Sequence, residues 1–193
     1  EEMIKPYNLN THVILDSHDE IPFIDKSFDN LSLDNKNQIL WEGQPATIRG
    51  VHLISLPLTR LSKSHDVHLN FVTDEKFFQF LNRYIQRNTI GLLKKDLGQI
   101  NSLVSVIPWT QENLAATAQR CKIAMIPIDL SVPMQRLKPE NRLLIMWRLG
   151  LPCLVSPSPA YTRVAREAGV NAVCENPDAW LQNFRELLDN PGF

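Results

Sequence analysis

Two cations lie close together just ahead of a strongly apolar stretch. They are Lys138 and Arg142 in the run KPENR, about one helical turn apart at the start of a helix predicted over 139–149. A helix N-terminus already carries partial positive charge, so cations are unfavourable there unless an anion binds them. The pair therefore predicts an anion site, with a solvated charge pair formed with Glu140 as the alternative.

Two further loops contain groups suited to phosphate. In GQPATIRG (43–50), Gly43 lets the backbone approach a ligand closely and Arg49 lies near a predicted helix start. In SPSP (156–159), Ser156 and Ser158 offer hydroxyls and backbone N–H groups before another helix. Each loop is also explained by ordinary turn and capping chemistry.

Motifs for other chemistries are absent from the sequence. It contains no G-x-G-x-x-G, no phosphate-binding G-x-x-x-x-G-K-[ST] loop and no G-x-S-x-G nucleophile motif. No histidine spacing fits zinc, so we expect neither a metal nor a cofactor. Cys121, Cys153 and Cys174 are widely separated in apolar runs, which predicts buried free thiols and a cytoplasmic location.

The composition limits the kinds of partner that this protein could bind. The 193 residues carry a net charge of −1 and are 44% hydrophobic, as in an ordinary globular protein without a basic field for nucleic acid. No apolar run approaches the roughly 18 residues of a membrane span. We therefore expect no nucleic-acid partner and no span, although a full-length protein peripheral to the membrane stays compatible with this composition.

Apolar strand-like runs alternate with helical patterns after a polar start. We predict a linker or edge segment over 1–37, with one apolar run at 13–15, and a single domain over 38–193. Strands are predicted at 38–41, 67–72, 104–107, 123–126, 153–155 and 172–174. This alternation predicts an α/β fold, a Rossmann-like parallel sheet of about six strands with helices on both faces.

Some of the helices are predicted in more detail. After Asp74 a helix would present Phe77, Leu81, Tyr84 and Ile85 as one stripe, and 90–103 would be helical. Pro57 should interrupt a helix over 51–61. The stretch RLLIMWRL is apolar nearly all round, so it needs cover beyond the sheet, which a second domain would supply.

Three segments carry a resemblance to a known family. KPENRLLIMWRLGLPCLVSPSPAY (138–161) resembles the C-terminal donor-binding domain of GT-B-fold glycosyltransferases, similar to family 4 or group 1, whose usual form reads K-P-x-N-K-L-x-E-Y-M-A-x-G-L-P-V-V-A-S. GQPATIRGVHLI is similar to their G-R-L-x-x-E-K-G-x-x-x-L-I segment, and VIPWTQENLAATAQRCKIAMIPI to a further strand–helix–strand run. The segments keep the family order over about 38–190.

The resemblance implies one half of a two-domain enzyme. The domain would bind a nucleotide-diphosphate sugar as co-substrate, and an N-terminal acceptor domain, missing from this chain, would complete a hexosyltransferase. The sugar would pass to an acceptor hydroxyl without a metal or other cofactor.

The resemblance also implies roles for individual residues. Gly43 would approach the diphosphate, Arg49 matches a phosphate-binding lysine, and Gln44 matches a phosphate-binding arginine without its charge. Ser156 and Ser158 match the phosphate-side loop. Pro108 and Trp109 would lie beside the nucleobase, where Trp109 either stacks on the base or is a buried structural residue.

The sequence departs from the family at two further positions. Leu137 and Ile145 stand where the family has two glutamates that contact the donor sugar and ribose, with Glu140 as a nearby substitute. Two readings follow: a divergent glycosyltransferase domain, or a degenerate GT-B-like domain without donor binding that acts as a scaffold or regulatory module. A third is another doubly wound nucleotide-binding domain, because fold alone does not fix function.

Overall fold

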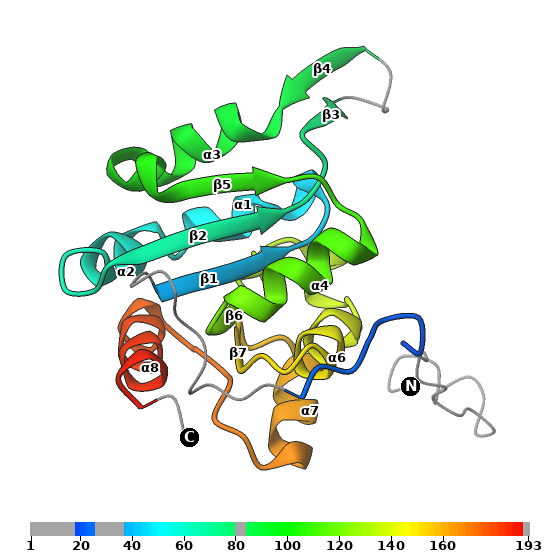
Figure 1. The fold of residues 1–193 in the computed structure, drawn as a ribbon, viewed down its shortest axis with the longest axis vertical. Coiled ribbons are helices and arrows are strands. Elements are labelled where there is room, and N and C mark those ends of the chain that lie inside the picture. The colour runs from blue at the N-terminus through cyan, green and yellow to red at the C-terminus, as the bar shows by residue number, and fades with distance from the viewer. Residues whose placement is uncertain (1–17, 26–36, 80–83, 191–193) are drawn as a thin grey trace.

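The computed structural model describes residues 18–25, 37–79 and 84–190 (Figure 1). Strands alternate with helices over most of this range. The strands are β1 (Asn37–Glu42), β2 (Val67–Val72), β3 (Lys76–Gln79), β4 (Ile85–Asn88), β5 (Val104–Ile107), β6 (Ile123–Ile126) and β7 (Cys153–Val155). The helices are α1 (Arg49–His52), α2 (Ser55–Leu61), α3 (Thr89–Leu97), α4 (Gln111–Arg120), α5 (Pro133–Arg136), α6 (Asn141–Arg148), α7 (Pro159–Ala168) and α8 (Pro177–Asp189). Two 3₁₀ turns lie at Pro45–Thr47 and Gly98–Leu103.

A parallel sheet forms the centre of the molecule. Its strand order is β5-β2-β1-β6-β7, and every pairing in it is parallel. The chain moves outward from β1 through β2 to β5, then returns to the other side of β1 and continues with β6 and β7. The predicted α/β class with a parallel Rossmann-like sheet is therefore confirmed, and the strand order reverses between β1 and β6.

Among the described residues the sheet has five strands in place of the predicted six. The segment predicted as the last strand, 172–174, contributes one isolated bridge between Val155 and Val173. Val155 exchanges two backbone hydrogen bonds with Ala172 and Cys174. Asn176 caps α8 directly afterwards, so the chain turns into a helix before a ladder can extend.

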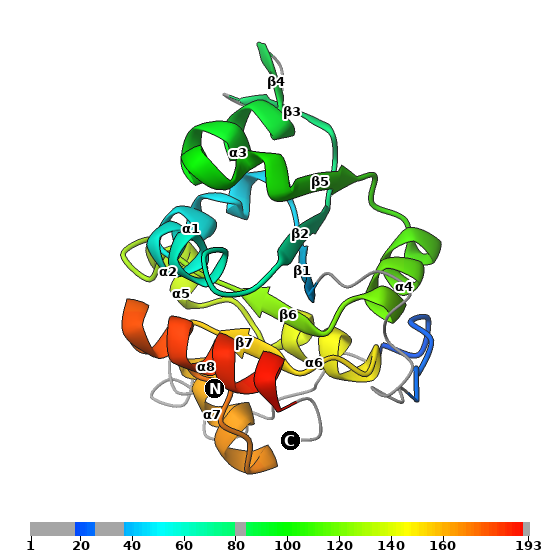
Figure 2. The same ribbon diagram turned by 60° about the vertical axis from the view of Figure 1, so that its left-hand side comes forward.

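Two apolar cores lie on opposite faces of the sheet. Successive side chains of a strand point to opposite faces, so neighbouring residues of β1 belong to different cores. Trp41 belongs to the first core and Leu40 to the second. The first core includes residues of α1, α2, α3 and α8, and the second includes residues of α4, α6 and α7. Figure 2 shows α1 and α2 on one side of the sheet and α4 and α6 on the other.

Several predicted helix ends are confirmed. Thr110 caps α4 through its hydroxyl, Ser158 caps α7 ahead of Pro159, and Gly169 ends α7 in the left-handed conformation with a φ of 69°. The helix predicted over 51–61 divides into α1 and α2 before Pro57. That proline lies in the first turn of α2, where a missing backbone N–H costs least. The segment predicted to be helical over 90–103 is an α-helix, α3, in its first part and a 3₁₀ turn in its second part.

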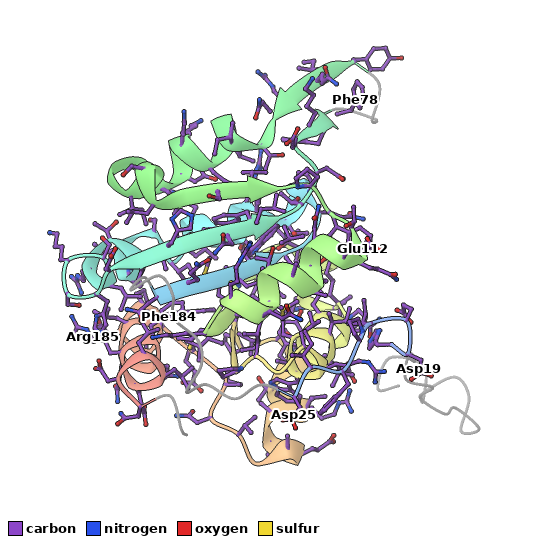
Figure 3. The ribbon with its side chains drawn as sticks, in the orientation of Figure 1. Asp19, Asp25, Phe78, Glu112, Phe184 and Arg185 are labelled. Carbon is purple, nitrogen blue, oxygen red and sulfur yellow. The ribbon has the colours of Figure 1, made fainter. Side chains whose placement is uncertain are left out.

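The predicted helix after Asp74 is wrong. Lys76–Gln79 and Ile85–Asn88 pair as antiparallel strands in a hairpin that projects from the sheet, with Phe78 near its far end (Figure 3). Aromatic and β-branched residues such as Phe77 and Ile85 favour extended backbone at least as much as helix. Tyr84 is 75% exposed, so no apolar face was available to stabilise a helix here. Leu81 and the apolar run at 13–15 lie outside the described residues.

Part of the surface of α6 that was predicted to need a second domain is covered by residues of this chain. Residues 18–25 pass along the end of α6, where Ile24 N donates to the Arg148 carbonyl at 3.0 Å. Arg148 Nε donates to the Ile21 carbonyl, and Ile21 is buried in the second core. The apolar helix therefore receives cover from the segment that precedes the sheet. Among the described helices, none is both long and apolar enough to cross a membrane.

Candidate functional site

The candidate site lies at the carboxyl ends of β1 and β6, where the strand order reverses. Open α/β sheets bind ligands at this position, because two loops diverge there and leave a crevice. Gly43 follows β1 with a φ of 151°, a conformation that side chains rarely adopt. Gly50, in α1, packs against the loop after β6, and a Cβ there would lie 2.1 Å from the Pro127 carbonyl oxygen. α1 is thereby held against the same edge.

Arg142 reaches over this edge from the first turn of α6. Its guanidinium lies 5.2 Å from the centroid of the Trp41 ring, and its Nε is 3.4 Å from Oε2 of Glu42. A Cβ on Gly43 would approach that guanidinium to 3.0 Å. A side chain at position 43 would therefore crowd the guanidinium of Arg142. Nη2 of Arg142 is buried without a hydrogen-bond partner among the described residues.

Glu42 joins Arg142 to the loop after β5. The Glu42 side chain is 13% exposed, and its Oε1 accepts a hydrogen bond from Trp109 Nε1 at 3.1 Å. Trp109 itself is 45% exposed, so the alternative of a buried structural tryptophan is wrong. The Pro108 carbonyl accepts a bond from Asn113 at 2.9 Å, which ties this loop to α4. Figure 3 places Glu112, at the start of α4, at the same end of the sheet.

Lys138 shares the electrostatic environment of Arg142 and Glu42. Burial lowers the pKa of Lys138, the charge of Arg142 lowers it further, and Glu42 offsets part of the effect. Lys138 and Arg142 together therefore carry one more charge than Glu42 can balance. The sequence prediction brought together Lys138, Arg142, Gly43 and Trp109, and the structure also places them at one edge.

Gln44 and Arg49 are both exposed on the connection after β1. The Gln44 carbonyl accepts bonds from the backbone N–H and hydroxyl of Thr47 at 2.9 and 2.8 Å, which shapes the 3₁₀ turn. Arg49 is the first residue of α1, next to Gly50, so its side chain extends from a helix that packs against this edge.

The serine loop is largely occupied by internal hydrogen bonds. Ser156 Oγ accepts from Ile128 N at 2.8 Å, and Ser158 Oγ accepts from Tyr161 N at 3.3 Å. The Ser158 N–H, expected to face phosphate, instead donates to the Ser156 carbonyl at 2.8 Å. That N–H is therefore engaged within the loop, and its contact with phosphate stays a prediction. The two serines, both buried, shape the loop between β7 and α7.

A cavity of about 450 Å³ lies away from these residues. It is lined by Pro152 and Cys153 at the amino end of β7 and by Val170 and Leu187 among others, mostly apolar groups. Such a lining offers few partners to a phosphate. No group of three or more metal-ligating side chains occurs in 18–25, 37–79 and 84–190.

Comparisons with solved structures identify the fold. WaaG, a glycosyltransferase involved in lipopolysaccharide biosynthesis, matches with a TM-score of 0.57 and 15% identity over 83% of this chain and 40% of its own. The S. aureus MnaA–UDP structure matches with a TM-score of 0.52 and 15% identity over 84% of this chain and 41% of its own. A Thermobaculum terrenum O-GlcNAc transferase mutant matches with a TM-score of 0.52 and 15% identity over 77% and 28%. The chain has a GT-B-like glycosyltransferase fold.

This GT-B-like chain spans less than half the length of the structures it matches. No protein-family model matches its sequence, and no curated protein matches it either. At these identities the likeness concerns the fold, so the chemistry has to be argued from the residues of this chain.

The structure also locates the departures from the family pattern. Leu137 is 55% exposed, and Ile145 packs against the second core. Glu140, considered as a substitute for a family glutamate, is buried and paired with Arg163. Its carboxylate stabilises the contact between α6 and α7. This pairing leaves Glu140 poorly placed to accept a hydrogen bond from a ribose hydroxyl.

Two residues of this GT-B-like site were missed in the sequence. Glu42 is the acceptor that joins Arg142 and Trp109, and Gly50 is the contact that fixes α1 against the loop after β6. A charged residue ending a buried strand, as Glu42 ends β1, was an available signal for the first. The spacing of glycines after β1 gave no indication of what Gly50 contacts.

Proposed function

We propose that this chain is the donor-binding half of a glycosyltransferase and binds the diphosphate of a nucleotide sugar at the edge between β1 and β6. Lys138 and Arg142 would contact the phosphates, Arg49 would add positive charge, and Trp109 would lie on the nucleobase side. One observation carries the proposal: Lys138 and Arg142 lie close enough that burial and the charge of Arg142 lower the pKa of Lys138, and Glu42 offsets only part of this effect.

The proposed reaction is transfer of the sugar to an acceptor hydroxyl. Negative charge grows on the diphosphate as the bond to the sugar breaks. Fixed cations in a partly dry site stabilise that charge without reorganising. The acceptor-binding half would be supplied by a further domain, and this chain covers 40% and 41% of two structures that share the fold.

A second candidate is a degenerate domain that acts as a scaffold. The ion pair between Arg142 and Glu42 favours it, because the carboxylate partly neutralises the arginine proposed to hold phosphate. Leu137 and Ile145, in place of the family glutamates, are consistent with it.

Nucleotide binding distinguishes the two candidates. The midpoint of thermal unfolding is measured with UDP, GDP, ADP and their sugar conjugates at millimolar concentration. A ligand at about 100 times its dissociation constant adds roughly 2.7 kcal/mol to the free energy of unfolding, which moves the midpoint by several degrees. A shift with one nucleotide identifies the donor base, and no shift with any of them favours the scaffold.

Paired variants then test the phosphate contacts. Lys138→Ala with Arg142→Ala should weaken nucleotide binding at least about tenfold, because each removes a charge-assisted contact. Lys94→Ala with Lys95→Ala is the matched control, since it removes two exposed lysines from α3. Arg142 is mostly buried, so circular dichroism checks the fold and Lys138→Ala is also measured alone. Unchanged affinity in the folded variants would remove the role proposed for both cations.

A further inference from the structure

Glu42 is an acidic side chain in direct contact with Arg142, one of the proposed phosphate contacts. Its two oxygens are both engaged, Oε2 with Arg142 at 3.4 Å and Oε1 with Trp109 at 3.1 Å. It is mostly buried at the end of β1, directly before Gly43. The carboxylate therefore lies between the arginine proposed for phosphate and the tryptophan proposed for the base.

The contact with Glu42 leaves Arg142 incompletely satisfied. A bidentate arginine–carboxylate pair has two contacts of about 2.7–2.9 Å, whereas here Nε makes a single contact at 3.4 Å. The buried Nη2 has no partner among the residues that the structure describes. An arginine in this state gains hydrogen bonds when it turns toward a phosphate. The ion pair with Glu42 therefore does not prevent phosphate binding.

Glu42 remains close to any phosphate that Arg142 contacts, and its repulsion grows with the charge of the ligand. A nucleotide-diphosphate sugar carries one charge on each phosphate. The nucleoside diphosphate left after sugar transfer carries about one more near neutral pH, because a terminal phosphate has a second pKa of about 6. The carboxylate therefore penalises the product more than the donor.

On this basis, and resting on the function proposed above, we infer that Glu42 is a specificity-determining residue that discriminates against the nucleoside-diphosphate product in favour of the sugar-conjugated donor. It acts by placing a fixed negative charge beside Arg142. Its second contact, with Trp109, holds the carboxylate in that position.

The test compares dissociation constants of donor and product in one titration series. UDP and UDP-glucose, GDP and GDP-mannose, and ADP and ADP-glucose are titrated calorimetrically into the 193-residue chain and into Glu42→Gln. Glutamine keeps an oxygen for Trp109 Nε1 and removes the charge. Glu112→Gln is the matched control, because it removes an exposed carboxylate at the start of α4, at the same end of the sheet.

In Glu42→Gln, the affinity for the free diphosphate should rise about tenfold more than the affinity for its sugar conjugate, the effect of one partly screened charge. Glu112→Gln should leave this ratio within about twofold of the unmodified chain. An equal change for donor and product, or weaker binding of the product, would overturn the inference while leaving the proposed function standing.

The remaining outcomes test both proposals together. If the unmodified chain binds none of these nucleotides, the proposed function fails and the inference about Glu42, which rests on it, fails with it, even where Glu42→Gln binds the free diphosphate. If neither protein binds any of them, both proposals fail.

Discussion

Single charged groups determine what the carboxyl edge of the sheet can bind. Glu42 decides how much of the charge of Arg142 is available, and Lys138 shares the same environment. Burial and the neighbouring Arg142 both disfavour the charged form of Lys138, and Glu42 favours it. A bound phosphate would favour it further, so binding and protonation of this lysine should be linked.

Nucleotide affinity should therefore fall as the pH rises. Without ligand the pKa of Lys138 is lowered, and an anion raises it, so between the two values the bound form holds more protons than the free form. We expect the affinity for ADP to decrease between about pH 8 and pH 10, where its phosphates are fully ionised. Calorimetric titration with ADP across this pH range measures how steeply the affinity changes with pH. Lys138→Met should bind more weakly with a flatter profile, and an equal slope in that variant would contradict the linkage.

At the scale of elements, the close packing of α1 against the loop after β6 fixes one wall of the site. Gly50 has no side chain, and the Pro127 carbonyl occupies the space where a Cβ would be. Backbone on both sides leaves no flexible group that can move aside. Gly91, in α3, is a helical glycine with open space around it.

Alanine at these two glycines should have opposite effects. Gly50→Ala is expected to lower the free energy of unfolding by about 2 kcal/mol or more, because α1 has to move away from Pro127. Gly91→Ala should raise it by roughly 0.5–1 kcal/mol, since alanine restricts the unfolded chain and meets nothing in the folded one. Urea denaturation measures both. Equal stability of the two variants would show that the contact at Gly50 is easily relieved.

For the whole molecule, the two cores share one sheet and should unfold together. The three thiols report on both of them: Cys174 belongs to the first core, and Cys121 and Cys153 belong to the second. All three are buried, and burial raises the pKa of Cys153 and raises that of Cys174 to about 12. Folded protein should therefore present no reactive thiolate from these residues.

Thiol labelling across a urea gradient should show one transition. We expect the three cysteines to become reactive at the same urea concentration, because the sheet couples the cores and small single domains usually unfold in two states. Mass spectrometry of labelled peptides resolves each cysteine, and fully denatured protein gives the reference for complete labelling. Earlier labelling of Cys174 alone would show that the core containing α8 opens separately.

Local sequence determined the main elements of this protein and several of their ends. Buried strands such as Val67–Val72, and the caps Thr110 and Ser158, are set by neighbouring residues through apolar periodicity and side-chain hydrogen bonds to the first helical turn. The pairing of Lys138 and Arg142 at one edge could also be predicted, because both precede or begin a single helix.

The tertiary structure decided what required distant partners. Lys76–Gln79 and Ile85–Asn88 pair as strands, with Phe78, Tyr84 and Ile85 exposed, and 172–174 forms a single bridge because α8 begins directly afterwards. Glu42 lies 100 residues from Arg142 and 67 from Trp109 along the chain, so its contacts depend on how β1, β5 and α6 meet. Periodicity and capping act over a few residues, whereas the charge that a ligand encounters here is set by packing across the sheet.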